Sequence, residues 1–120
     1  MAIEWKTEDD NLIVCHVSGM LGKAEYDEML SNLESVIQET GEVRILVLLQ
    51  DFAGWEKADG WEDTSVTDRN DAYLKKYAIV GDEKWRDLVA LFTLQGMRPV
   101  PIEYFGPGEE QTARQWLSED

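Results

Sequence analysis

The sequence contains one cysteine and one histidine, and this scarcity excludes several kinds of chemistry. A single cysteine cannot form an internal disulfide, so an oxidising compartment is not indicated. A single histidine removes histidine-based metal sites and any Ser-His-Asp triad. Cys15 and His16 are adjacent on a predicted strand, so their side chains point to opposite faces and cannot form a dyad. We therefore expect no cysteine- or histidine-based catalysis, and we expect Cys15 to be a small core residue.

Basic residues are also scarce, since 11 Lys and Arg stand against 25 Asp and Glu for a net charge of −14. Nucleic-acid binding and docking on anionic lipid both need a basic surface, so neither partner is expected. The longest apolar run is about seven residues, against about 20 for a membrane-spanning helix. The first residues lack the basic and apolar regions of a signal peptide. These features predict a soluble cytoplasmic protein.

Apolar residues are plentiful, at 43% of 120 residues with five Trp, so the chain can form a core. We expect one domain over residues 1–120, with no linker or repeat. Period-two runs and one continuous apolar run predict strands, and apolar residues three and four apart predict helices. The predicted strands cover 2–7, 12–18, 43–49, 77–81 and 99–105. The predicted helices cover 26–37 with a stop at Gly41, 68–76, 82–92 with Asp82 as its cap, and a final helix with Thr112, Ala113, Trp116 and Leu117 inward.

This order predicts an α/β fold, because strands that alternate with helices form mainly parallel sheets through right-handed crossovers. The short connection after the first strand favours an antiparallel hairpin. We predict a five-stranded sheet of order 1-2-3-4-5, with strand 1 antiparallel and about four helices. In the second strand, Leu12, Val14 and His16 point to one face, whereas Ile13 and Cys15 point to the other.

Five short segments together indicate a family. They are GKAEY (22–26), DFAGW (51–55), AIVGDEKW (78–85), YF (104–105) and ARQWL (113–117). In this succession the chain resembles the SpoIIAA-like proteins, small bacterial domains related in fold to STAS and to the lipid-binding CRAL-TRIO (Sec14-like) domains. The resemblance spans nearly the whole chain. It implies a βα superhelix and a binding or regulatory role rather than catalysis.

One departure from the STAS pattern concerns phosphorylation. Anti-sigma factor antagonists of the STAS type carry a phosphorylatable Ser in an Asp-Ser-Ser-Gly-like turn after the corresponding strand. Here residues 58–65 read ADGWEDTS, so the sigma-factor switch does not carry over. Thr64 and Ser65 remain conceivable phosphosites near a helix start, although Glu62 and Asp63 beside them would repel a phosphate.

The segment 50–65, directly after the continuous apolar strand, is the candidate site. Ligands of open α/β sheets bind outside the carboxyl ends of strands. The large rings of this segment either pack on the end of the sheet or form a mobile lid over an apolar cleft, with Gly54 and Gly60 as hinges. The predicted ligand-binding residues are Asp51, Phe52, Trp55, Trp61 and Trp85.

Three functions stay open at this point. The first is a cleft that binds a lipid-like molecule or a partner segment, and the second is a regulatory protein–protein interaction domain of the STAS type without its phosphoserine motif. The third is an enzyme that uses the loop carboxylates. Those carboxylates lack the EF-hand spacing, so we expect no metal and no cofactor. The broad apolar surface of the predicted helix 82–92 is usually core; if part of it is exposed, a homodimer or another partner would cover it.

Overall fold

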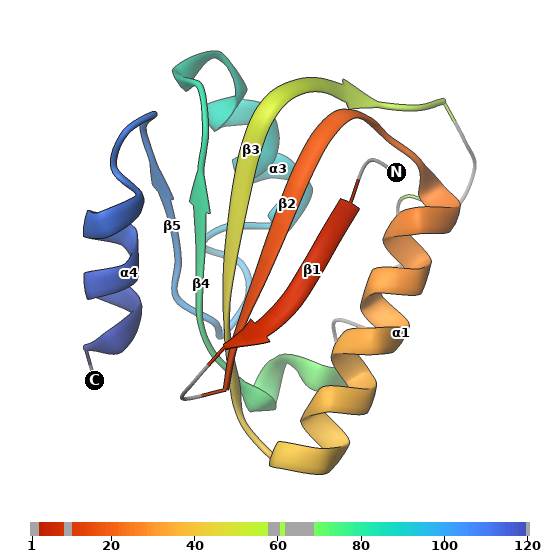
Figure 1. The fold of residues 1–120 in the computed structure, drawn as a ribbon, viewed down its shortest axis with the longest axis vertical. Helices are drawn as coiled ribbons and strands as arrows, with labels where there is room; N and C mark the ends of the chain where they lie inside the picture. Colours follow the sequence, from red (N-terminus) through yellow and green to blue (C-terminus); the bar gives the residue numbers. More distant parts are fainter. Residues whose placement is uncertain (1–2, 9–10, 58–60, 62–68, 120) are drawn as a thin grey trace.

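The computed structural model describes residues 3–8, 11–57, 61 and 69–119, which form a five-stranded sheet with helices on both faces (Figure 1). The strands are β1 (Ile3–Glu8), β2 (Leu12–Leu21), β3 (Val43–Trp55), β4 (Leu74–Val80) and β5 (Ile102–Phe105). The helices are α1 (Lys23–Thr40), α3 (Arg86–Thr93) and α4 (Glu110–Ser118), with short 3-10 turns η2 (Asp71–Tyr73) and η3 (Glu83–Trp85).

The sheet has the predicted topology. Its order is β1-β2-β3-β4-β5, with β1 antiparallel to β2 and every other pair parallel. The described residues contain three α-helices, whereas the sequence predicted about four. None of these helices is both long and apolar enough to cross a membrane.

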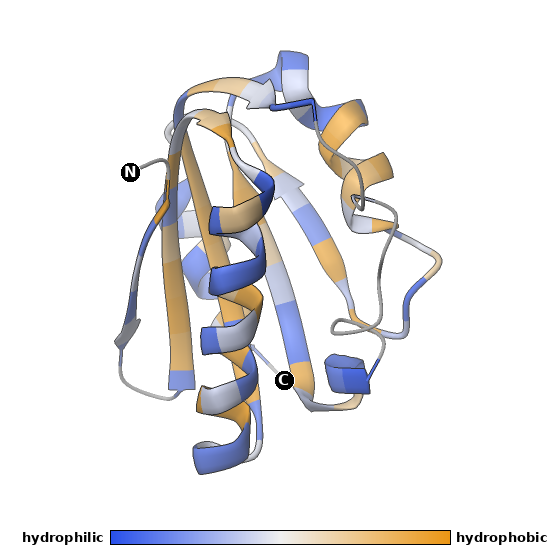
Figure 2. Cartoon of the chain, turned by 90° about the vertical axis from the view of Figure 1, so that its right-hand side faces the viewer, coloured by the Kyte–Doolittle hydropathy of each residue, from blue (hydrophilic) through white to orange (hydrophobic). Residues whose placement is uncertain are grey.

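Two apolar layers enclose the sheet, one on each face. Ile13 and Cys15 pack beneath α1 and α3, whereas Val14 packs beneath α4 on the other face, as the alternation predicted. Figure 2 shows the hydrophobic strands running behind α1, with α3 beside them. In α4 only Ala113 and Leu117 are buried, and Thr112 is exposed. The prediction of an inward Thr112 is wrong, because a nine-residue helix presents only a narrow stripe to the sheet.

The two helix boundary signals are confirmed. Gly41 ends α1 with φ of 93°, a left-handed conformation that favours glycine, and its N–H donates to Ile37 O at 2.7 Å. Asp82 begins the η3–α3 segment, and its Oδ1 accepts a hydrogen bond from Lys84 N at 3.1 Å. The end of α1 and the start of the η3–α3 segment therefore lie where the sequence predicted them.

The second and third strands are longer than predicted, and residues 50–55 are not a loop. The two strands bend together beyond Val17, where the register shifts, and continue to pair as far as Leu21 and Trp55. Asp51 takes a φ of 53° and Gly54 a φ of 109°, which lets β3 follow the bend. The predicted lid is therefore wrong for residues 50–55, and residues 58–60 and 62–65 lie outside the described part.

The predicted helix over 68–76 is also wrong in its second half. Asp71–Tyr73 form one 3-10 turn, and β4 begins at Leu74, three residues before the predicted strand. Pairing of Leu74 with Val43 and burial of its side chain outweigh local helix propensity. The last strand covers only Ile102–Phe105, since the prolines at 99 and 101 cannot donate ladder bonds.

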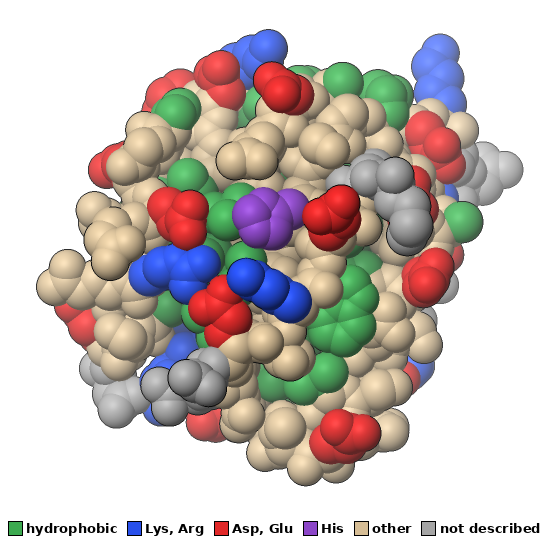
Figure 3. Space-filling view, in the orientation of Figure 1, with side chains coloured by type: hydrophobic (Ala, Val, Ile, Leu, Met, Phe, Trp, Pro, Cys, Tyr) green, Lys and Arg blue, Asp and Glu red, His purple; other side chains and the backbone are tan. Residues whose placement is uncertain are grey.

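The sheet face beside α4 remains open over β1 and β2. His16, half-buried, lies there among acidic and basic side chains (Figure 3). A polar groove of about 260 Å³ runs past it, lined by Glu4, Ser18 and Gln50. Because Cys15 faces the opposite layer, the two residues form no dyad, as the sequence predicted.

Candidate ligand-binding cavity

Six aromatic side chains from separate parts of the chain form one continuous cluster. Adjacent ring centroids are 4.9 to 6.0 Å apart, and every pair is tilted or edge-on, the arrangement that ring quadrupoles favour. The indole N–H of Trp55 is buried here without a hydrogen-bond acceptor in the described part of the chain. The cluster, called the ring cluster below, consists of Tyr26, Phe52, Trp55, Trp61, Trp85 and Phe92.

The ring cluster contains Phe52, Trp55, Trp61 and Trp85, four of the five predicted ligand-binding residues. Asp51 lies apart from them, exposed in the bend of β3, and lines no part of the cavity described below. Sequence reasoning missed Tyr26 and Phe92 as site residues. In the sequence, both appear only as members of apolar helical stripes. Such a stripe does not show which residues of other elements a side chain will contact.

Hydrogen bonds made by Glu56 hold Trp61 in the ring cluster. Its Nε1 donates to Glu56 O at 3.0 Å, and the Glu56 carboxylate accepts a hydrogen bond from Lys23 N at 2.9 Å. Glu56 thus accepts a hydrogen bond from a backbone N–H in the first turn of α1 that has no partner within the helix. This acidic side chain therefore has a structural role. Among the described residues, no group of three or more His, Cys, Asp or Glu side chains gathers as metal ligands would. The predicted phosphosites Thr64 and Ser65 lie outside the described residues.

Behind the ring cluster lies an inner cavity, made of two adjoining chambers between the sheet and the helices α1 and α3. Each chamber has a volume of about 50 Å³. One extends toward Trp55 and the carboxyl ends of the strands, and the other toward Leu74 and Arg98. The wall that both chambers share consists of Tyr26, Met29, Val47, Tyr77, Phe92 and Thr93.

Two tyrosines, Tyr26 and Tyr77, belong to the shared wall. Neither the Tyr26 nor the Tyr77 hydroxyl makes a hydrogen bond with any residue that the structure describes. Burial raises the pKa of Tyr26 to about 12 and raises the pKa of Tyr77 still further. Both groups therefore remain neutral hydrogen-bond donors at physiological pH.

The Cys15 thiol and the Thr93 hydroxyl, two further polar groups around the inner cavity, are both occupied. Burial raises the pKa of the Cys15 thiol to about 12, and the thiol lies 3.8 Å from the Met29 sulfur. The Thr93 hydroxyl donates to Val89 O at 2.9 Å. Neither group is thus available as a nucleophile.

A buried ion pair closes one end of the inner cavity. Arg98 donates to both carboxylate oxygens of Asp71 and to Thr93 O, at 2.6 to 3.1 Å. Burial opposes the charged guanidinium, but the hydrogen bonds and charge of Asp71 outweigh it, so the pKa of Arg98 is raised. No sequence signal linked these residues, because they lie 27 positions apart in two connecting segments.

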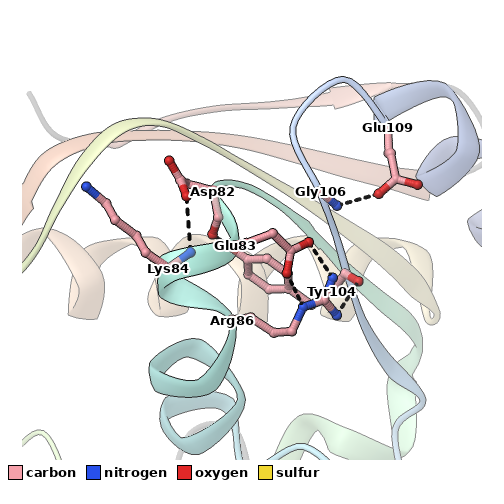
Figure 4. Close-up of polar contacts among 7 residues, drawn as sticks. All are labelled: Asp82, Glu83, Lys84, Arg86, Tyr104, Gly106 and Glu109. Atoms are coloured by element: carbon pink, nitrogen blue, oxygen red, sulfur yellow. Dashed lines mark hydrogen bonds and ion pairs between the residues drawn. The ribbon is translucent and has the colours of Figure 1, made fainter.

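The polar groups at the carboxyl ends of β4 and β5 satisfy one another (Figure 4). Tyr104 donates its hydroxyl to Asp82 O at 2.7 Å, and Arg86 pairs with Glu83 while also donating to Tyr104 O at 3.2 Å. Glu109 accepts a hydrogen bond from Gly106 N at 2.7 Å, which ties the last strand to the turn before α4. This edge of the sheet is therefore a structural network, and the cavity lies beneath the helices instead.

Comparison with known proteins places this fold. The model of the SpoIIAA-like family matches residues 12–118. The crystal structure of an uncharacterised DUF3478-family protein with a SpoIIAA-like fold, from Shewanella loihica PV-4, superposes with a TM-score of 0.71. It is 21% identical in sequence, and the match covers 97% of this chain and 92% of that one. A search of curated protein sequences gives no match. The family match spans most of the chain, and the chain therefore belongs to the SpoIIAA-like family.

Proposed function

We propose that this protein is a non-catalytic binding domain that holds a compact apolar molecule in the inner cavity. The observation that carries the proposal is the pair of adjoining chambers lined by the ring cluster and the apolar face of the sheet. Binding pockets are concave and mainly apolar, with a few polar groups that orient the ligand. Tyr26 and Tyr77 are such groups here.

The size of the inner cavity restricts the ligand. Two chambers of about 50 Å³ each are smaller than an apolar cavity of roughly 150 Å³ that admits benzene. A ring of five or six atoms fits after small side-chain adjustments, whereas a long acyl chain would require α3 to move away from the sheet. We therefore narrow the sequence prediction of a lipid-like ligand to a small apolar one.

Protonation states support binding rather than catalysis. The Cys15 thiol and both phenols stay protonated, Asp71 is engaged by Arg98, and His16 lies on the other face of the sheet. General acid–base catalysis needs a group whose pKa lies near the working pH and that can reach the ligand. The described wall of the cavity offers none.

Titration with benzene, followed by NMR shifts of the methyl groups that line the cavity, tests this proposal. Val47 borders both chambers, so Val47→Ile should fill space and weaken benzene binding by at least about fivefold, or about 1 kcal/mol. The same change at Val80, which is buried against α4, is the matched control and should leave the affinity unchanged. Absence of benzene binding to the unmodified protein would exclude the proposal.

A second candidate function is a protein–protein interaction domain of the STAS type that works without the phosphoserine motif. The supporting observation is the outward side of α3 and the turn after it, where Leu88 is 49% exposed, Leu91 71% and Met97 82%. A net charge of −14 opposes self-association and favours a basic partner.

A photo-crosslinking amino acid at Leu91 tests this second function in the cells from which the chain derives. The matched control position is Met20, which is also apolar and 50% exposed but lies on β2. One adduct of defined mass that forms at Leu91 and not at Met20 is the expected result. Equal labelling at both positions, or none at either, would contradict an interaction surface on α3.

A further inference from the structure

The two outer edges of the sheet are closed to different degrees. At the β5 edge, Ile102 O accepts a hydrogen bond from Gln95 Nε2 at 2.7 Å, and Tyr104 O accepts one from Arg86 Nη1 at 3.2 Å. Both carbonyls face away from β4, because the carbonyls next to them in the strand bond toward it. Side chains of the chain itself therefore cover this edge.

The outer edge of β1 is open over most of its length. Among the described strands β1 pairs only with β2, and it lies at one edge of the sheet in Figure 1. Ile3 N donates outside the β1–β2 ladder, to Glu25 Oε2 at 3.4 Å. Since hydrogen-bonded and non-hydrogen-bonded pairs alternate in an antiparallel ladder, the backbone groups of Trp5 and Thr7 also point outward. The described residues supply no partner for these outward groups.

A small pocket adjoins this edge on the side of α1. Its volume is about 40 Å³, and it lies between β1 and one stripe of α1. Its described lining combines three apolar side chains with two carboxylates and contains no basic residue. A lysine or arginine side chain matches this combination, because its stem packs on apolar surface while its charged end reaches an acid. The lining residues are Ile3, Trp5, Glu25, Glu28, Met29 and Asn32.

An antiparallel strand added to this edge would direct one side chain to the pocket. The residue directly opposite Trp5 would exchange both backbone hydrogen bonds with it and point its side chain to the same face of the sheet. That face is the α1 side, because Trp5 packs against the buried layer there. The residues on either side of it would point to the other face, beside Glu4 and Lys6.

Charge decides which occupant fits the β1 edge. Two copies joined through β1 would bring their acidic α1 stripes toward each other, and each chain carries a net charge of −14. Like charges across an interface oppose association. A segment with basic side chains is instead attracted, both by Glu25 and Glu28 at the pocket and by the net charge of the protein.

We propose that the outer edge of β1 binds an extended basic segment of a partner protein as a sixth strand, with a lysine or arginine opposite Trp5 in the pocket beside α1. Strand addition of this kind takes its affinity from main-chain hydrogen bonds and its specificity from alternate side chains. The β1 edge is distinct from the outward side of α3, and the inference does not require a ligand in the inner cavity.

NMR titration with capped seven-residue peptides tests the inference on the unmodified protein. The first peptide is TVTKTVT, with lysine at its centre, and two others carry norleucine or glutamate there. With TVTKTVT the amide protons of Trp5 and Thr7 should shift downfield, whereas those of Glu4 and Lys6 should shift less because they already bond to β2. Norleucine keeps the aliphatic stem without the charge and should bind about twofold to fivefold more weakly, the range of one exposed ion pair. Glutamate should bind more weakly still.

Backbone N-methylation of the peptide separates strand addition from loose attraction of charge. The N–H of the central lysine would bond to Trp5 O, whereas the N–H of the threonine before it would point away from β1. Methylation of the lysine N–H should therefore abolish the Trp5 and Thr7 shifts. The same change at the threonine is the matched control and should leave them in place.

Two protein variants test the pocket. Glu28→Gln removes one carboxylate of the pocket and should weaken TVTKTVT binding by about twofold to fivefold, without effect on the norleucine peptide. Glu39→Gln is the matched control, because it changes the net charge equally at an exposed position of α1 that does not line the pocket. It should leave both affinities unchanged.

Several results would overturn the inference. One is equal affinity for the lysine and glutamate peptides, and another is an equal effect of the two methylations. Failure of every peptide to shift the Trp5 and Thr7 amides at millimolar concentration would also exclude it. Shifts of these amides that follow protein concentration without any peptide would show that a second copy occupies the β1 edge, and the inference of a basic partner segment would be wrong.

Discussion

Asp71 and Arg98 form a bidentate ion pair that is almost completely buried. The Arg98 Nη2–Asp71 Oδ1 distance is 2.6 Å, and the Nε–Oδ2 distance is 3.1 Å. Asp71 lies just before β4, and Arg98 lies in the segment between α3 and β5. The pair therefore links the starts of two neighbouring strands at one end of the inner cavity, where the backbone is otherwise irregular.

Removal of one partner of this pair should destabilise the protein strongly. Arg98→Met leaves the Asp71 carboxylate buried without its cation, and such a change costs about 3–5 kcal/mol. Urea denaturation at pH 7 measures the loss. The control is Lys6→Met, which breaks an exposed pair with Glu8 and should have little effect. A similar, small change for both variants would show that the buried pair contributes little to stability.

The sheet could be predicted from sequence because its strands carry strong local signals. The continuous apolar run from Val43 to Leu49 and the alternation through Ile13 and Cys15 fixed the buried strand and the faces of its neighbour. The extension of β3 to Trp55 could not be predicted. It depends on pairing with the end of β2 around a bulge, and Asp51 and Gly54 read locally as turn residues.

The candidate site was predicted in part for a similar reason. Large rings that follow a buried strand indicate a place where apolar groups gather, and Trp55 and Trp85 do meet, with centroids 6.0 Å apart. The polar groups of the inner cavity gave no such signal. Tyr77 and Arg98 are ordinary residues in the sequence, and only the packing of α1 and α3 over the sheet brings them together.

Cys15 should be unreactive while the protein is folded. Its thiol is 1% exposed, and burial raises its pKa to about 12, so the thiolate is almost absent at pH 8. Labelling by a thiol reagent such as DTNB should therefore require unfolding. Its rate should rise with urea in parallel with the loss of folded protein. Rapid labelling of the native protein at pH 8 would contradict the described packing of β2 beneath α1.

Gly81→Ala should destabilise the protein through close contacts with two side chains. A Cβ at this position would lie 2.7 Å from the Tyr104 hydroxyl and 2.9 Å from Leu49 Cδ1. Overpacking of this kind costs about 1–3 kcal/mol. Combination with Tyr104→Phe removes the closest clash, so the double variant should lose less stability than the sum of the single variants. Gly108→Ala is the control, because it meets no atom within 4 Å and should show no coupling to Tyr104→Phe.

Glu34 should make a contribution to stability that depends on pH. It accepts hydrogen bonds from Arg69 at 2.6 Å and from Asn70 at 2.8 Å, and these bonds lower the pKa of its carboxyl group from 4.5 to about 2. A carboxyl group whose pKa is lower in the folded state stabilises the protein above its unfolded pKa. That stabilisation is lost as the pH falls through the folded value.

Comparison of the unmodified protein with Glu34→Gln isolates this contribution from the other acidic groups, whose mutual repulsion also changes with pH. The difference between the two urea midpoints should be constant above pH 4.5 and should close as the pH falls toward 2. Glu28→Gln, at an exposed position of the same helix, is the matched control and should give a smaller difference. If the Glu34→Gln difference persists unchanged at pH 2, the stabilisation does not depend on the ionised carboxylate. The contact between α1 and the segment before β4 would then not require the charge of Glu34.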